Sequence, residues 1–250
     1  MKAVERVIHS MQNNLGEPIT IDDMARTAMF SKFHFSRMFQ RVTGISPRRF
    51  LSALRLQEAK RLLVTSSLTV SDISYRVGYN SIGTFSSRFR TNVGLSPTAY
   101  RQVDGYVPPL EEHLPPSWLG RDEQSVVQGR IHCPAESQRG RIVVGLFHKR
   151  IAQGWPIRHT TLPAAGEFTL FDVPDGTWHL LARSLDSGLG EEYVATLGPL
   201  TVSAGKPARP VDMWLRRKRI FDPPTLLAQL DESMQADRAR LPGEHALPGV

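Results

Sequence analysis

The sequence repeats one pattern with a constant offset of 50 residues. Ser31, Phe35, Phe39, Gly44 and Ser46-Pro47 recur as Ser81, Phe85, Phe89, Gly94 and Ser96-Pro97. In each copy the serine is suited to cap a helix, and the two phenylalanines lie on one face of that helix. The glycine and the following Ser-Pro then end it. The repeat therefore predicts two copies of a helix–turn–helix unit.

Further helical patterns surround and join the two copies. Val4, Val7, Ile8 and Met11 follow helical spacing. Short helices are predicted over Ile21–Ala28 and from Thr69 to about Gly78, and a long one over residues 48 to 63. At 1.5 Å per residue the long helix would span about 24 Å. Residues 1–103 are therefore predicted to form an all-α double helix–turn–helix domain, two three-helix units joined by one long helix.

The periodicity changes after a proline-rich linker at residues 104–125. Alternating and apolar runs separated by Gly, Pro and Asp turns indicate about seven strands in 90 residues, which favours an antiparallel β-sandwich over residues 126–216. The expected strands are 126–127, 142–147, 168–171, 178–182, 194–196, 200–202 and 211–215. The tail, residues 217–250, carries a short predicted helix from Thr225 to about Arg240 and an end that we expect to fray.

Composition excludes several classes of protein. No run of about 18 apolar residues predicts a membrane span, and residues 1–6 lead straight into an amphipathic pattern without a signal-peptide core. A single cysteine, Cys133, cannot form an intramolecular disulfide. We therefore expect a cytoplasmic protein without a membrane partner.

Charge is divided unevenly along the chain. Residues 1–103 hold 15 Lys and Arg against 6 Asp and Glu, a net charge of +9, whereas the other residues hold 16 against 18, a net of −2. A basic helical half fits a polyanionic partner such as nucleic acid. A basic surface that is merely solvated remains the alternative.

The first repeat has an outer face suited to reading DNA. Opposite its core residues lie Phe33, Arg37 and Gln40, and Lys32, Ser36, Arg41 and His34 flank them. Arg can grip a guanine edge, an apolar side chain can contact a thymine methyl, and Lys and Gln can reach phosphates or bases. Alternatively, Phe33 packs against a neighbouring helix and the charges are solvated.

The second repeat has a weaker outer face. Gly83, Ser87 and Thr91 lie opposite its core, beside Thr84, Ser86 and Arg90, while Arg88 falls on the side that flanks the core, from which it can reach a phosphate. Short hydroxyl side chains suit phosphate contacts better than strict base selection. We expect the first unit to carry most of the specificity.

These residues resemble the AraC/XylS family of bacterial transcriptional regulators over about residues 1–103. The matching motifs are Ile21-Asp22-Asp23-Met24-Ala25, residues 31–39, Val77-Gly78-Tyr79, Thr84-Phe85 and residues 94–101. The resemblance implies two units in successive major-groove segments, about 34 Å apart. Its base-reading positions fall on Phe33, Ser36 and Arg37 in the first unit, and on Ile82, Gly83, Ser86 and Ser87 in the second. The family often has Arg where this chain has Ser87, and it usually places the sensor before the DNA-binding domain.

The residues and the resemblance together predict a DNA-contacting set. The predicted base contacts are Phe33, Ser36, Arg37, Gln40, Ile82, Gly83, Ser86 and Ser87. The predicted phosphate contacts are Ser31, Lys32, Arg41, Arg48, Arg49, Thr84, Arg88, Arg90 and Arg101. Binding should then depend strongly on salt. Expected partners are duplex DNA and RNA polymerase, with a small-molecule effector and a homodimer through the β half left open.

Other chemistry has weaker support in the sequence. The β half is similar to transthyretin and carboxypeptidase-regulatory sandwiches around residues 166–170 and 173–178. Neither a cofactor motif nor a catalytic set is recognisable, and neighbouring strand residues such as His132 and Cys133 point to opposite faces, which disfavours a metal site. An enzyme acting through the β half and an architectural protein that binds DNA without sequence preference remain the alternatives.

Overall fold

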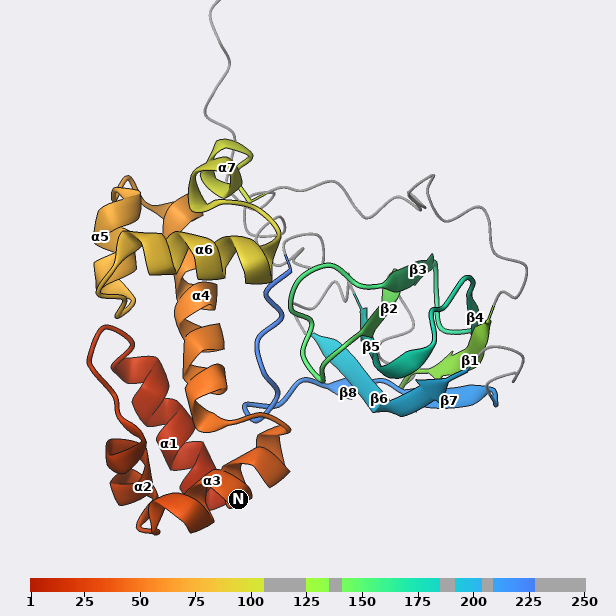
Figure 1. Cartoon of the computed structure of the whole chain (residues 1–250), viewed down its shortest axis with the longest axis horizontal. Helices are drawn as coiled ribbons and strands as arrows, with labels where there is room; N and C mark the ends of the chain where they lie inside the picture. The colour runs from red at the N-terminus through yellow and green to blue at the C-terminus, as the bar shows by residue number, and fades with distance from the viewer. Residues whose placement is uncertain (106–124, 135–140, 185–191, 204–208, 228–250) are drawn as a thin grey trace, which may run out of the picture.

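The computed structural model describes residues 1–105, 125–134, 141–184, 192–203 and 209–227 (Figure 1). Within these ranges the chain forms a helical half, residues 1–105, and a β half, residues 125–217. A segment without helix or strand, residues 218–227, follows and is called the strap below. No helix in the described ranges is long and apolar enough to cross a membrane.

The first three-helix unit comprises α1 (Lys2–Asn13), α2 (Ile21–Ala28) and α3 (Lys32–Thr43). The side chains of Thr20 and Asp23 form a capping box at the start of α2, and Ser31 Oγ accepts a hydrogen bond from the backbone N–H of His34. Gly44 ends α3 at φ +80°, a conformation that favours glycine. The serine cap and the stop glycine predicted from the repeat therefore set the bounds of α3.

The second unit, α5 (Val70–Arg76), α6 (Ile82–Val93) and α7 (Pro97–Gln102), uses the same devices. Thr69 and Asp72 form the capping box, Ser81 caps α6, and Gly94 ends it at φ +93°. The Ser96-Pro97 pair, expected only to stop the preceding helix, also begins α7. Proline is tolerated at the first helical position because that N–H has no intrahelical partner.

The helix α4 (Pro47–Thr65) joins the two units and is slightly longer than the predicted helix. It is apolar around much of its circumference, because Phe50, Leu51 and Leu54 enter the core of the first unit while Leu56, Leu62 and others enter that of the second. A helix buried on two sides fixes the units relative to each other.

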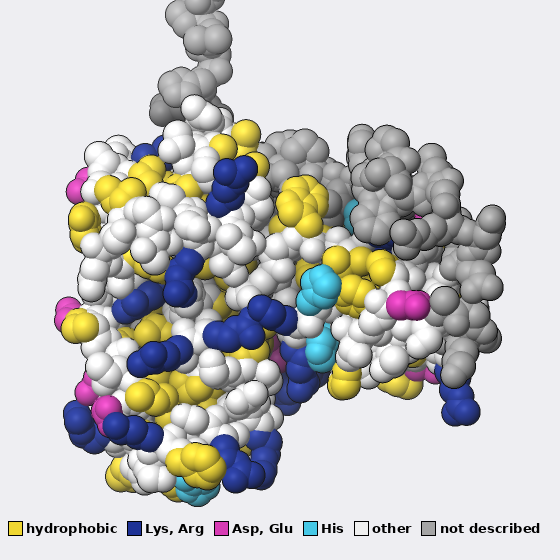
Figure 2. Space-filling view, viewed as in Figure 1, with side chains coloured by type: hydrophobic (Ala, Val, Ile, Leu, Met, Phe, Trp, Pro, Cys, Tyr) yellow, Lys and Arg dark blue, Asp and Glu magenta, His cyan; other side chains and the backbone are white. Residues whose placement is uncertain are grey.

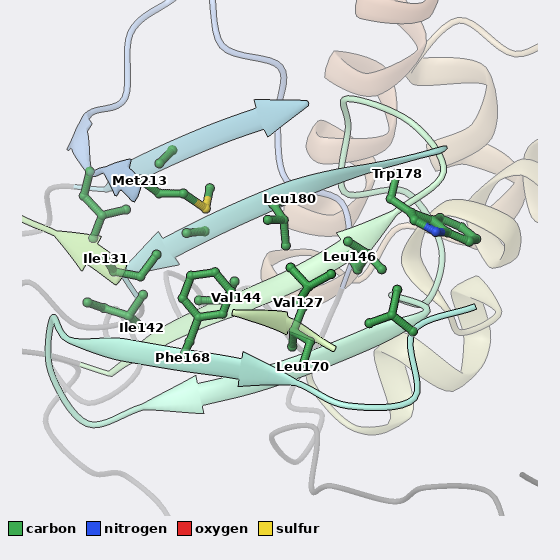
Figure 3. Close-up of a cluster of buried hydrophobic side chains, with 14 of the residues drawn as sticks. Val127, Ile131, Ile142, Val144, Leu146, Phe168, Leu170, Trp178, Leu180 and Met213 are labelled. Carbon is green, nitrogen blue, oxygen red and sulfur yellow. The ribbon is translucent and has the colours of Figure 1, made fainter. Parts of the chain in front are cut away.

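The β half contains two sheets. The three-stranded sheet has the order β4 (Glu167–Leu170), β1 (Val127–His132), β7 (Val211–Trp214). The five-stranded sheet has the order β3 (Arg158–Leu162), β2 (Ile142–Phe147), β5 (Gly176–Ser184), β6 (Tyr193–Val202), β8 (Arg216–Arg217). Side chains from both sheets share one core, in which Phe168 and Met213 of one sheet meet Val144 and Leu180 of the other (Figure 3).

Several strand predictions need correction. The β half is not wholly antiparallel, because β7 enters beside β1 in the same direction, with Gly129 opposite Val211. The two strands expected at 194–196 and 200–202 are one strand, β6, since a register shift at Trp178 and Leu180 lets β5 pair with it on both sides of Gly198. The strands β3 and β8 were not expected, because β3 is polar and β8 has two residues.

The strap runs between α4 and the β sheets and connects the two halves (Figure 1). Leu226 is fully buried in the core of the second helical unit, Leu227 packs with Val143 and Phe147, and Phe221 packs against the core of the first unit. The buried Lys60 on α4 donates from Nζ to the Leu226 carbonyl at 3.1 Å. Residues 225–227 are not helical; the rest of the helix predicted there, and most of the predicted linker, lie outside the described residues.

Candidate nucleic-acid interface

The helices α3 and α6 are both oriented by pairs of buried phenylalanines. Phe35 and Phe39 are completely buried in the first unit, with ring centroids 5.5 Å apart, and Phe85 and Phe89 are completely buried in the second, 5.7 Å apart. Phe50 of α4 packs edge-on against Phe39, and Tyr100 of α7 against Phe89. Because the buried phenylalanines occupy corresponding positions in α3 and α6, the opposite face of each helix points away from the core.

The outer face of α3 carries an exposed aromatic and an arginine next to each other. Phe33 is 72% exposed, so it does not pack against a neighbouring helix as the alternative interpretation required. The guanidinium of Arg37 lies over its ring, 5.4 Å from the centroid. Gln40 and Arg41 are exposed and Ser36 is half-buried. This face presents both an apolar group and a rigid bidentate donor, the pair needed for thymine methyls and guanine edges.

The outer face of α6 is exposed but chemically sparse. Ile82 is 40% exposed, and a Cβ added at Gly83 would make an ordinary contact with Ser81 Oγ at 3.8 Å. Ser86 is half-buried, and the remaining predicted contacts of this helix are exposed: Thr84, Ser87, Arg88 and Arg90. Arg88, expected on the side that flanks the core, is exposed there. Arg88 and Arg90 carry the long hydrogen-bond-donating side chains of α6.

Acidic residues are absent from both helices, whose sequences are KFHFSRMFQRVT and IGTFSSRFRTNV. Figure 2 shows Lys and Arg side chains distributed down one face of the helical half, with few Asp or Glu side chains among them. An extended cationic face with little acidic interruption attracts a polyanion over the whole distance between the units.

The start of α3 has one competing interaction. Lys32 Nζ lies 2.7 Å from Asp22 Oδ1, and both side chains are largely exposed. An exposed pair of this kind contributes about 0–1 kcal/mol, so a phosphate can displace the carboxylate. Ser31, also exposed, uses its hydroxyl oxygen as the N-cap acceptor.

The predicted phosphate-contacting arginines outside α3 and α6 differ in their availability. Arg48, at the start of α4, is exposed. Arg49 donates to Gln153 Oε1 of the β half at 2.9 Å. Arg101 donates to the carbonyls of Leu63 and Leu68 at 3.0 and 2.6 Å, which fastens α7 to the end of α4. The structure therefore leaves Arg48 available and uses Arg101 within the helical half.

The sequence analysis missed Arg55, which connects the two units from α4. Its guanidinium donates to the carbonyls of Gly78 and Glu17 at 2.8 and 2.7 Å. Burial lowers the pKa of Arg55 from its ordinary value, opposed by the nearby Tyr79. Arg55 thus positions the turn before α6 relative to the first unit. The motif Val77-Gly78-Tyr79 marks that turn, but no sequence signal pairs it with Arg55.

The histidines and Cys133 do not form a metal centre in the described part of the chain. No group of three or more His, Cys, Asp or Glu side chains converges there. His132 Nε2 lies 2.7 Å from Asp212 Oδ1 and its ring stacks on Trp214, with centroids 4.8 Å apart. These contacts account for His132 without a bound ion.

A cavity of about 400 Å³ lies where the two halves meet. The end of α3 contributes Thr43, the strands β6 and β7 contribute Thr196 and Trp214, and Arg150 and Arg216 add positive charge. Arg216 is bound to Asp222 of the strap through two hydrogen bonds of 2.6 and 2.7 Å.

Comparison with known proteins places the similarity in the helical half. A helix–turn–helix domain family matches residues 24–103. The transcriptional activator AarP of Providencia stuartii is 30% identical over 104 residues, which cover 41% of this chain and 77% of AarP. The activator RhaS of Escherichia coli is 33% identical over 98 residues, 39% of this chain and 35% of RhaS. The match thus spans most of AarP but about a third of RhaS.

Solved structures also match this part of the chain. The DNA-binding domain of AdpA, solved with a target DNA, is 32% identical, with a TM-score of 0.39; the match covers 40% of this chain and 90% of that domain. An AraC-type transcriptional regulator from Chromobacterium violaceum is 27% identical, with a TM-score of 0.40; the match covers 41% of this chain and 92% of that one.

Proposed function

Because this chain belongs to the AraC-type family of helix–turn–helix transcription regulators, we propose that it regulates transcription by reading two successive major-groove segments of duplex DNA with α3 and α6. The observation that carries the proposal is the pair of capped helices with acid-free outer faces, fixed to one buried helix, α4. The two segments would face the protein from one side of the duplex, one helical turn apart.

The proposal gives α3 most of the base reading. Arg37 can grip a guanine edge with two hydrogen bonds, Phe33 can contact a thymine methyl, and Ser36 and Gln40 can contact neighbouring bases. In α6 the proposed base contacts are Ile82, Gly83, Ser86 and Ser87, whose short side chains support weaker selection. Phosphate contacts are proposed for Ser31, Lys32, Arg41, Arg48, Thr84, Arg88 and Arg90.

Replacing Arg37 with alanine tests this assignment. We expect Arg37→Ala to weaken binding to a selected DNA site by about 1–3 kcal/mol and to relax selection at one base position. The measurement is a competition titration of full-length protein on the selected duplex against random duplex of equal length. Arg61→Ala serves as control, because Arg61 is an exposed arginine of α4 paired with Glu58. Equal losses on selected and random DNA would exclude base reading by Arg37.

The β half is proposed to be a sandwich that senses an effector. Its single core shared by two sheets supports the sandwich, and the cavity of about 400 Å³ beside α3 supports a ligand site coupled to DNA binding. The similarity to transthyretin-like sandwiches, contact with RNA polymerase, homodimerisation through the β half and a cytoplasmic location remain predictions. So do the domain limits at 103, 126 and 216.

Two other functions remain testable against this one. A non-specific architectural role would give equal affinity for selected and random DNA. An enzymatic role would require turnover of a small substrate at the β half, for which the described residues offer no recognised catalytic set. AarP and RhaS are transcription activators, which favours regulation over both.

A further inference from the structure

One connection of the β half lies against the proposed DNA-binding helices. The ten residues between β2 and β3, residues 148–157, extend from the sheet toward the helical half. A methyl group placed on Gly44, which ends α3, would lie 3.4 Å from the guanidinium carbon of Arg150. The backbone N–H of Gly154 donates to the Asn92 carbonyl near the end of α6 at 3.4 Å. The connection therefore reaches the carboxyl ends of both helices.

The same connection touches a proposed phosphate-binding region. Gln153 accepts the hydrogen bond from Arg49, beside the exposed Arg48 at the start of α4. Figure 2 shows that basic and His side chains continue from the helical half onto the adjoining edge of the β half. The connection thus extends the cationic face rather than interrupting it.

The connection between β2 and β3 is itself basic. The connection, residues 148–157, contains Lys149 and Arg150 and no Asp or Glu. His148, Lys149 and Arg150 are consecutive and exposed. A local cationic segment beside a polyanion site is what phosphate binding requires.

Helix polarity gives a second reason for a cation here. The carboxyl end of a helix carries a partial negative charge, which disfavours a nearby phosphate. The guanidinium of Arg150 lies against the end of α3 and offsets that partial negative charge, so its positive charge also stabilises the helix. Lys149 has no such contact among the described interactions, and its ammonium is exposed.

We propose that the β2–β3 connection is a third DNA-contacting element, in which Lys149, supported by Arg150, binds the phosphate backbone beside the carboxyl ends of α3 and α6. This rests on the proposed function, because it requires DNA to lie across both helices. The β half then contributes directly to DNA affinity.

The test is the salt dependence of binding by the full-length protein. Fluorescence anisotropy with a random-sequence 40-base-pair duplex between 50 and 200 mM KCl gives the slope of log K against log [KCl]. We expect Lys149→Gln to reduce the magnitude of that slope by about 0.9, the value for one phosphate contact. Lys149→Glu is expected to reduce affinity further at every salt concentration.

The matched control is Arg209→Gln, which also removes one exposed positive charge. Arg209 precedes Val211 at one end of β7, whereas Trp214 at the other end lines the cavity shared with Thr43 of α3. Its slope should equal that of the wild type. If Lys149→Gln and Arg209→Gln give the same slope, this inference is overturned while the proposed function stands. If the wild type shows no salt-dependent binding, the proposed function itself fails.

Discussion

At the residue scale, Gly78 and Gly83 illustrate how local geometry decides the effect of the same change. Gly78 adopts φ +82°, and an added Cβ would collide with the Leu15 carbonyl and the Arg55 guanidinium. Gly83 lies in the first turn of α6, where an added Cβ would make an ordinary contact with Ser81 Oγ at 3.8 Å. The turn before α6 therefore requires glycine at position 78, whereas packing does not require glycine at position 83.

We therefore expect opposite effects of alanine on stability. Gly78→Ala should lower the free energy of unfolding by more than about 1 kcal/mol, because it combines backbone strain with a collision. Gly83→Ala should raise it by up to about 1 kcal/mol, the difference in helix propensity. Urea unfolding of both variants measures this. Equal destabilisation by the two would contradict the described turn.

Residue roles that depend on local periodicity were predictable, and those that depend on distant partners were not. The spacing of Phe35 and Phe39 predicted which face of α3 is buried, and with it the exposure of Arg37. Arg101 looked free for a phosphate, yet it binds carbonyls 33 and 38 residues earlier in the chain. A local sequence pattern cannot predict such long-range pairs. Whether the predicted contacts touch DNA stays a prediction.

At the element scale, the packing of the strap is the feature that the sequence predicts least well. The helical bounds followed from caps and stop glycines, because those signals are local. Leu226, by contrast, enters a helical core formed by residues more than 120 positions earlier. Strand pairing was equally hard to predict, since the parallel β1–β7 pair joins segments 82 residues apart at Gly129 and Val211.

Leu226→Ala tests the strap's place in the helical core. We expect a loss of about 2–5 kcal/mol of stability, because the change leaves a cavity among buried side chains. Hydrogen exchange should accelerate in α4 and α6. Leu227→Ala, the neighbouring control, should instead accelerate exchange in β2, where Leu227 packs against Val143 and Phe147. Unchanged protection of α4 and α6 in Leu226→Ala would contradict the packing.

The ion pair between the strap and β8 predicts a pH dependence. Burial raises the pKa of Asp222, but the hydrogen bonds and charges of Arg216 and Arg219 outweigh burial and hold the pKa below its usual 3.8. A carboxylate with a lowered pKa in the folded state stabilises above its unfolded pKa, and this contribution is lost as the pH falls through the folded pKa.

Asp222→Asn should therefore be less stable than the wild type at pH 7, and the difference should shrink as the pH falls below about 4. Urea unfolding between pH 2 and 7 measures it. Asp175→Asn controls for removing an exposed carboxylate. A difference that stays constant down to pH 2 would rule out the Arg216–Asp222 pair as its source.

At the scale of the whole molecule, the two halves share contacts on several elements. The strap reaches both helical units, and the β2–β3 connection reaches the ends of α3 and α6. Composition separated a strongly basic stretch, residues 1–103, from the rest of the chain, and the helical half of the described structure coincides with that stretch. Their mutual packing could not be predicted, because the linking residues carry no periodic signal.

The most direct test of the central claim is selection and sequencing of random 40-base-pair duplexes bound by the full-length protein near physiological salt. The proposed function predicts a motif of two segments about one helical turn apart, with stronger base preference in the segment read by α3. Recovery of bound DNA without any shared motif would contradict sequence-specific recognition by α3 and α6.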